Sequence, residues 1–414
     1  MRRRKSVLLW GVCVPAALTA LAALTVSRPA EAGALSGNCR LAGQPAATLL
    51  VPFFEADLDN PSGPNTLVSV NNASAKPALA RVVLWTDWGV PTLAFDVYLT
   101  GYDVQTLNLR DLLLGALPAT GVQVSPLGSL SESADAPAGC TGAPAPLTPN
   151  QRGWLRAAHT GRPLPGTSPA RCAGHGGRPA QLASGYVTID TVRRCSPAAV
   201  GNRVNTPADP QYFGAPGIEA VADTANVLWG DIFYVESGGN QADSETAVAI
   251  VADPDFFSAG DYTFYGRFVS FDGRDKRAPL SSLYYARYLD GGPFSGGTDL
   301  LVWRDTRESA PAPRACGVQP SWQPLGEMQM VLFDEEENPQ EIPDSNIFPL
   351  AAQKVHVGGD SMPVTAPFGW AMVDLWHSDG AHAQGYVTVR MTAEGRFSAG
   401  HAALRADDLC NFGP

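Results

Sequence analysis

The chain contains 414 residues and carries a formal net charge of −11 at pH 7, so nucleic acid and anionic membrane surfaces are unfavourable partners. Only 17% of the residues are charged, and 42 glycines and 35 prolines are spread along the chain, a composition that favours short strands joined by turns over long helices. The length is typical of two domains that each bury a hydrophobic core.

The first 32 residues have the pattern of a secretory signal peptide. A basic head over residues 2–5 precedes an uncharged run over residues 7–26, and the small residues Ala30 and Ala32 offer a cleavage site. We therefore predict a cleaved signal peptide over residues 1–32 and a secreted, periplasmic or cell-surface protein without a membrane span after cleavage. Because the uncharged run is long enough to cross a bilayer, an uncleaved anchor is the alternative.

The cysteines predict a disulfide framework. Cys13 lies in the signal peptide, and an even number of cysteines remains for an oxidising compartment, which predicts three disulfides. Their spacing does not select a connectivity. As a working hypothesis, Cys140 pairs with Cys172, Cys39 with Cys195, and Cys316 with Cys410. Zinc is the competing interpretation, but the chain has no closely spaced cysteine pair of the kind that zinc sites use.

Two halves of the mature sequence share an order of patterns. One match between strands means little, because strands share a binary pattern, but several matches in the same order predict an internal duplication. The expected domains are residues 33–254 and 255–414. The matched segments are 49–70 with 283–302, 80–87 with 328–334, 93–109 with 347–357, and 184–190 with both 368–374 and 384–389.

A long loop interrupts the first half. Residues 116–183 are crowded with Pro, Ala, Gly and Ser, and we expect them to form an insertion in the first domain. Within it, Thr148 and Pro149 have the residue types of a helix start and Gly161 that of a helix end, so one short helix is predicted there.

The predicted strands alternate between polar and apolar residues. Alternation buries one face of a strand and leaves the other in water, which is typical of antiparallel sheets. We therefore predict an all-β fold of two antiparallel β-sandwich domains. Residues 66–109, with strand, Asn-rich turn, strand, short loop and strand, resemble the immunoglobulin-like sandwich modules of exported bacterial proteins. This resemblance implies an architecture and no activity.

A possible hydrolase motif lies near the C-terminus. Ser361 follows Gly and Asp, and Asp374 and His377 come shortly after, which resembles two sequence blocks of SGNH-type esterases. In that family the two blocks lie at opposite ends of an α/β domain, whereas here they are close together in a β-rich stretch. The pattern therefore favours a noncatalytic protein, and an extracellular esterase-type hydrolase is kept as a less favoured alternative.

Two ligand sites are predicted. Asp57, Asp59 and Asn60 lie in a tight loop and offer hard oxygen ligands for Ca²⁺, although their spacing is not that of an EF-hand and an ordinary turn is the alternative. Trp85 and Trp88 could form a platform on which sugar rings stack, although tryptophans on strands more often belong to a core.

These observations favour a noncatalytic structural, surface or recognition protein of a bacterial envelope. A glycan-binding module is the alternative. The expected partner is a polysaccharide or another envelope protein, with no nucleic acid, and Ca²⁺ is a possible ligand rather than a required cofactor.

Overall fold

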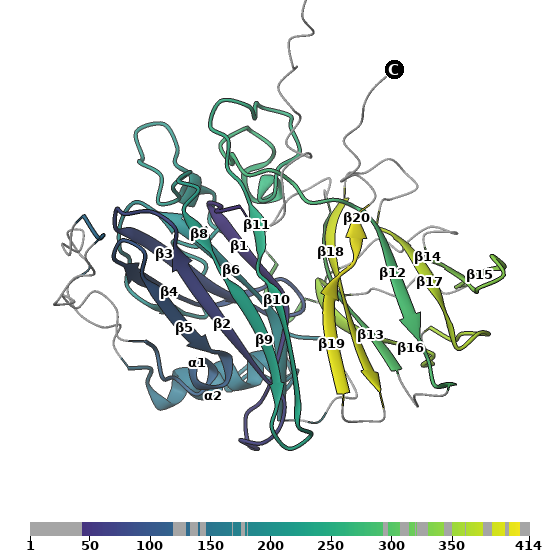
Figure 1. Cartoon of the computed structure of the whole chain (residues 1–414). Coiled ribbons are helices and arrows are strands. Elements are labelled where there is room, and N and C mark those ends of the chain that lie inside the picture. The colour runs from purple at the N-terminus through teal and green to yellow at the C-terminus, as the bar shows by residue number, and fades with distance from the viewer. Residues whose placement is uncertain are drawn as a thin grey trace, which may run out of the picture. The chain divides into compact units, whose positions relative to one another are not determined.

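Antiparallel strands are the main regular structure in the part of the chain that the structure describes, as the sequence predicts (Figure 1). The structure is a computed structural model. The predicted signal peptide over residues 1–32 lies outside the described residues, as do Cys39, Cys410, Ser361 and His377. The described residues are 44–118, 130–132, 140, 146–167, 169–174, 179, 181–292, 297–306, 314–318, 320, 330–342, 350–360, 362–375, 383–393 and 397–405.

The first module comprises strands β1 to β11. They form one sheet in the order β11-β1-β6-β3-β4-β7 and a second in the order β10-β9-β2-β5, with β8 paired to β2. The strands are β1 (Thr48–Asp57), β2 (Asn65–Asn72), β3 (Ala78–Trp85), β4 (Pro91–Leu99), β5 (Val104–Asn108), β6 (Leu182–Val192), β7 (Ala199–Val200), β8 (Leu228–Trp229), β9 (Asp231–Glu236), β10 (Gln241–Thr246) and β11 (Val248–Ile250).

The second module comprises strands β12 to β20. Its sheets have the orders β15-β14-β17-β12-β20 and β16-β13-β18-β19. The strands are β12 (Leu283–Leu289), β13 (Gly297–Thr306), β14 (Met330–Phe333), β15 (Pro339–Glu341), β16 (Ala352–Val357), β17 (Phe368–Asp374), β18 (Ala383–Ala393), β19 (Phe397–Ala402) and β20 (Leu404–Arg405). Residues 251–282 connect the modules, and the domain boundary after residue 254 stays a prediction.

The two modules repeat one topology. If β1 to β6 correspond to β12 to β17, and β9, β10 and β11 to β18, β19 and β20, then β11-β1-β6-β3-β4 has the order of β20-β12-β17-β14-β15. By the same correspondence of strands, the order β10-β9-β2-β5 in the first module matches β19-β18-β13-β16 in the second. The predicted duplication is therefore present in the strand order, with β7 and β8 as additions to the first module.

Equivalent residues make the same contacts in both modules. The buried Thr66 of β2 donates its hydroxyl to the carbonyl of Glu55 and accepts the amide proton of Glu55, with distances of 3.0 and 3.2 Å. The buried Thr298 of β13 makes the same two bonds with Leu289, each of 2.8 Å. This threonine joins the end of the first strand of each module to the start of the second.

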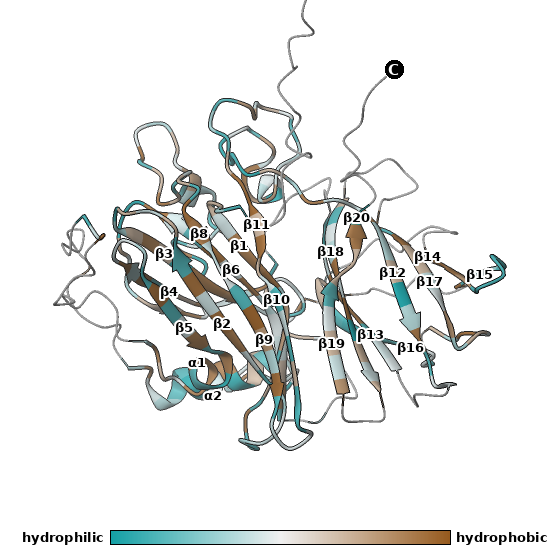
Figure 2. Cartoon of the chain, viewed as in Figure 1, coloured by the Kyte–Doolittle hydropathy of each residue, from teal (hydrophilic) through white to brown (hydrophobic). Residues whose placement is uncertain are grey.

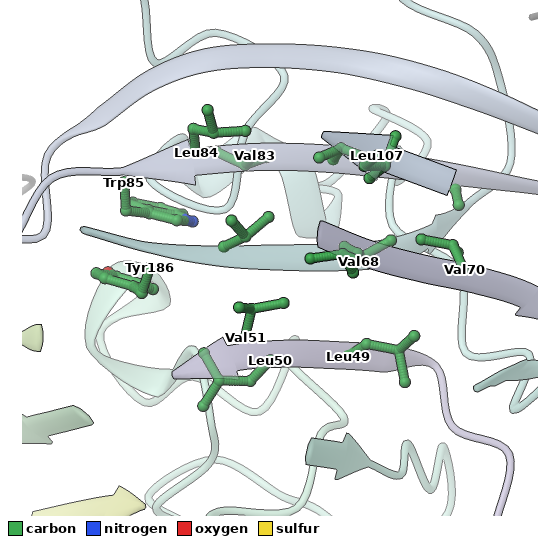
Figure 3. Packing of buried hydrophobic residues seen from close by; sticks show 14 of the residues in the cluster. Leu49, Leu50, Val51, Val68, Val70, Val83, Leu84, Trp85, Leu107 and Tyr186 are labelled. Carbon is green, nitrogen blue, oxygen red and sulfur yellow. The ribbon is translucent and has the colours of Figure 1, made fainter. Parts of the chain in front are cut away.

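A glycine followed by an aromatic residue also recurs. Tyr186 of β6 stacks on Trp85 of β3 at a centroid distance of 5.6 Å, and their rings lie face to face in Figure 3. In the second module Trp370 of β17 stacks on Phe333 of β14 at 4.2 Å. A Cβ atom at the preceding glycine, Gly185 or Gly369, would lie 2.0 Å from a carbonyl oxygen of the neighbouring strand. Only glycine allows this close approach.

The cores of the two modules meet at strand β13. Leu300 and Val302 point into the second core, whereas Leu301 and Trp303, with opposite parity, join the cluster of the first module. β13 is therefore buried on both faces, which is unusual for an antiparallel strand in a sandwich.

Among the described residues, two α-helices accompany the first module, α1 (Leu109–Leu113) and α2 (Pro149–His159). α2 lies in the loop that the sequence predicts to be helical, and Thr148 and Gln151 form a capping box at its start. Its buried His159 lies 2.7 Å from the Thr92 hydroxyl and 3.0 Å from the Ser184 carbonyl. These contacts hold the helix against β4 and β6.

The disulfide hypothesis is wrong in its pairing. Cys140 is bonded to Cys195, and Cys172 to Cys316, so the three suggested pairs are not formed. Cys172 is buried with Leu164 and with residues of α2, and Cys316 packs against this group. The long loop is thus fastened to other parts of the chain rather than to itself. Two disulfides indicate an oxidising compartment.

The close approach at Gly369 gives a stability prediction. Gly369→Ala and Gly185→Ala should each lower the free energy of unfolding by about 3 kcal/mol, because the new methyl group forces the strands apart. Gly153→Ala in α2 is the control, since nothing lies within 4 Å of its Cβ position and alanine favours a helix. Urea denaturation measures all three, and wild-type stability of both strand variants would contradict the strand packing described.

Candidate functional site

The outer face of the sheet β10-β9-β2-β5 carries the candidate site. Leu228, Ile232 and Tyr234 of β8 and β9 are buried, whereas Trp229 and Phe233 have the opposite parity and are 41% and 40% exposed. Strand β2 continues this face, because its register places Asn71 opposite Trp229 and Leu67 opposite Phe233. Figure 2 shows hydrophobic and hydrophilic segments alternating along β2.

A groove of about 480 Å³ opens on this face. Its floor contains Leu67 and Ser69 of β2 and Thr106 of β5, and Phe233 of β9 completes the lining on one side. Helix α1 and the segment after it, which includes Pro118, form the opposite wall. This volume is within the range of small-molecule sites, and the lining is mostly apolar with a few polar groups, as is common for such sites.

Polar groups are held in order between the two exposed aromatic residues. The amide of Asp231 donates to the Ser69 hydroxyl at 3.0 Å, and the Asn71 amide donates to the same hydroxyl at 3.3 Å and to the Trp229 carbonyl at 3.2 Å. Asp231 lies between Trp229 and Phe233 along the strand and shares their parity. The face therefore presents an aromatic ring, a carboxylate and a second ring in succession.

The wall of the groove is positioned by the start of α1. Asn108 caps the helix by accepting the amide protons of Arg110 and Asp111, and it also accepts a hydrogen bond of 2.9 Å from the Asn65 side chain. Asp111, on the exposed side of α1, contributes a carboxylate to the groove. β2 and β5 thus fix the helix against the sheet that forms the floor.

The loop predicted to bind calcium surrounds an arginine. The Arg110 guanidinium donates to the carbonyls of Asp57, Pro61, Gly63 and Pro64 at 2.6 to 3.0 Å. A cation that belongs to the chain therefore takes up the loop carbonyls that a metal ion would need. The sequence showed only the oxygen-rich loop that suggested calcium. It did not show that Arg110, about fifty residues further along the chain, folds back onto this loop.

The three predicted calcium ligands have other partners. Asp57 accepts the amide protons of Asp59 and Asn60 in a turn, and Asp59 forms an ion pair with Arg156 of α2. Among the described residues, no three of His, Cys, Asp and Glu are grouped as a metal site would require. The calcium site stays a prediction that these contacts do not favour.

The structure places the predicted tryptophan platform inside the protein. Trp85 is fully buried between Tyr186 and Phe268, and its indole donates to the Thr188 hydroxyl at 2.8 Å. Trp88 is 7% exposed. Neither ring offers a free face, whereas Trp229 and Phe233 are exposed beside the groove. The parity of residues 228–234, in which Asp231 shares a face with both, was the signal that sequence reasoning missed.

The hydrolase residues are not brought together in the described part of the chain. Asp374 ends β17, whereas Ser361 and His377 lie outside the described residues.

One buried cluster of charged and polar side chains lies at the end of the first module. The fully buried Asp190 of β6 accepts hydrogen bonds from Thr48, Tyr212 and Tyr265 and lies 3.5 Å from the Arg277 guanidinium. Burial raises the pKa of Asp190, and Arg277 opposes that shift. Because every member is buried, this group fastens the connector to β1 and β6 and offers no access to a substrate.

A second ionic group lies where the modules meet. Lys354 of β16 contacts Glu55 of β1 at 2.8 Å, and Arg390 of β18 contacts Glu55 at 3.4 Å and Asp243 of β10 at 3.1 Å. The nearby Glu245 accepts hydrogen bonds from Tyr234 and Thr388. Burial raises the pKa of Glu245 to about 7, although these hydrogen bonds and Arg390 favour its charged form.

Comparisons of the chain with protein-family models, with curated proteins and with solved structures found no match. Among the described helices, none has the length and apolar character needed to cross a bilayer. The functional argument therefore depends on the groove and on the exposed aromatic face beside it.

The loop around Arg110 gives a prediction about metal dependence. Arg110→Met should lower the free energy of unfolding by about 2 kcal/mol, because four loop carbonyls, most of them partly buried, lose a charged donor. The wild-type melting temperature should be the same with Ca²⁺ and with EDTA, since the guanidinium uses the loop carbonyls. A rise in the wild-type melting temperature on adding Ca²⁺ would restore the calcium interpretation.

The second ionic group predicts a pH effect. The folded-state pKa of Glu245 lies above its ordinary value of 4.5, so the folded state binds the proton more tightly. The free energy of unfolding should therefore fall as pH rises from about 4.5 to about 7, by about 2 kcal/mol after allowance for partial exposure.

Glu245→Gln isolates that effect, because the amide imitates the protonated carboxyl group at every pH. Urea denaturation between pH 4.5 and 8 should show a flatter profile for this variant than for the wild type. Glu236→Gln, at the end of β9, is the control and should retain the wild-type profile. Parallel profiles for wild type and Glu245→Gln would contradict the assignment.

Proposed function

We propose that this chain is an exported, noncatalytic recognition protein, a structural or surface component of a bacterial envelope that binds its partner through the groove between β2, β5 and α1. The groove is the observation that carries the proposal. It combines an apolar floor with ordered polar groups, and it lies on a rigid sheet rather than on loops.

Export is part of the proposal. The two disulfides support an oxidising compartment, and the basic head with its uncharged run supports a cleaved signal peptide over residues 1–32. The strand pattern of residues 66–109 supports an immunoglobulin-like module, a type that exported proteins often use for recognition rather than for chemistry.

The noncatalytic reading has support in the placement of the ionisable groups. Asp190 and Arg277 are enclosed in the end of the first module, and Glu245 lies where the two modules meet. Their shifted pKa values follow from burial in structural networks rather than from a cleft in which a substrate could meet them. No specific observation favours the esterase alternative.

Sedimentation with isolated bacterial envelopes tests the proposal. The mature protein should pellet with the envelopes in a saturable manner, and Thr106→Trp should weaken this binding at least about tenfold, because an indole at this exposed position fills the groove. Ser258→Trp, on an exposed part of the connector, is the control for an added tryptophan and should bind like the wild type.

Two results would contradict the proposal. If Thr106→Trp pellets as well as the wild type, the groove is not the recognition site. If amino-terminal sequencing of the protein from the culture medium, periplasm or envelope finds no processed chain, the export part is wrong.

A further inference from the structure

Two exposed aromatic residues of the first module, Trp229 and Phe233, lie in one line beside the groove. Trp229 of β8 and Phe233 of β9 pair with β2 in one register and are four residues apart, which corresponds to about 13 Å at 3.3 Å per residue. Both rings are about two-fifths exposed, and Val104 of β5, which is 56% exposed, lies in the row of Asn71 and Trp229. Large exposed apolar side chains that gather in one place commonly mark an interaction site.

The polar groups between the rings are suited to hydroxyl groups. Asp231 places a carboxylate midway between Trp229 and Phe233, and the Ser69 hydroxyl lies next to it, 3.5 Å from its Oδ2 atom. Thr106 lies opposite Ser69 in the β2–β5 register and adds a second hydroxyl to the floor of the groove. Carboxylate and hydroxyl oxygens accept hydrogen bonds from the hydroxyl groups of a ligand.

The charge of the site narrows the ligand class further. Among the described residues that line the groove, the charged one is Asp111, and the adjoining face adds Asp231, so both charges are negative. An anionic ligand would be repelled by these carboxylates and by the acidic chain as a whole. A flat apolar ring face that carries hydroxyl groups at its edge, with no negative charge, matches both the aromatic rings and the acceptors.

We propose that Trp229, Asp231 and Phe233, together with the adjoining groove, bind a short stretch of an uncharged polysaccharide. Two of its sugar rings stack on the indole and the phenyl ring, the hydroxyl groups between them donate to Asp231, and others exchange hydrogen bonds with Thr106 on the floor of the groove. The sheet fixes the spacing of the two aromatic rings, so little order has to be gained on binding. This inference rests on the proposed function, because it names the partner of the same groove.

Calorimetry with defined sugars tests the inference. The probes are cellotetraose and chitotetraose as uncharged chains and tetragalacturonate as an anionic chain of similar length. One of the uncharged chains should bind saturably, and tetragalacturonate should not. Trp229→Ala and Phe233→Ala should each weaken binding at least about tenfold, whereas Trp229→Phe, which keeps a ring, should retain affinity within about threefold.

Phe368→Ala is the matched control, because Phe368 of β17 is 42% exposed and lies in the second module. It should bind the sugars like the wild type. Thermal melting of each variant shows whether it is folded, and the retained ring of Trp229→Phe keeps the test valid if the alanine variant does not fold.

The outcomes separate this inference from the proposed function. If neither uncharged sugar binds, while envelope sedimentation still depends on Thr106 and Phe233, the partner is of another class and the saccharide inference is wrong. If a sugar binds equally well to Trp229→Ala and Phe233→Ala, the aromatic face is not its site. If sedimentation is independent of Thr106, the proposed function itself fails.

Discussion

The burial of β13 on both faces is the constraint on which the rest of the structure depends. Leu300 and Val302 are buried in the core of the second module. Leu301 and Trp303, on the opposite face of the strand, are buried in the core of the first module, so neither module can cover this strand alone. Charged side chains on the neighbouring strands of the same sheet, Lys354 and Arg390, lose part of their hydration as a result. Carboxylates of the first module replace the lost hydration by interacting with these two cations. They are Glu55, Asp243 and Glu245, and this role explains why carboxylates gather where the modules meet.

This constraint also explains how a duplicated fold acquired two different halves. Both modules keep the threonine that joins their first two strands and the glycine that admits a stacked aromatic pair. The differences lie in the surfaces. The second module uses the outer face of β13 for contact, whereas the corresponding face of β2 in the first module remains open and carries the groove.

Much of the fold could be predicted from the sequence, because alternation along a strand is a local property. The equivalence of residues 184–190 and 368–374 is correct, since β6 and β17 occupy the same place in their sheets. Residues 384–389 match the same pattern for another reason. They belong to β18, and Gly385 also passes close to its neighbours, so the resemblance reflects backbone crowding rather than an equivalent position.

The site was harder to predict, because its properties depend on contacts between distant residues. Trp85 follows three apolar residues and has the pattern of a buried strand, yet the sequence alone does not say whether a tryptophan on a strand faces a core or water. The calcium prediction missed that Arg110 reaches back to the loop. The disulfide pairing depends on where Cys172 and Cys316 meet in space, at a sequence separation of 144, which spacing does not reveal.

The Cys172–Cys316 bond has a mechanical consequence. It joins the long loop of the first module to the segment that follows β13, so the backbone between these residues and the bond itself form a closed ring. The connector over residues 251–282 is part of this ring. A protease that cut the connector once would leave the two modules attached through sulfur, and a pulling force on the chain would pass through the bond rather than through the connector. Separation of the modules therefore requires both a cut and a reductant, a durable arrangement for a protein in an oxidising compartment.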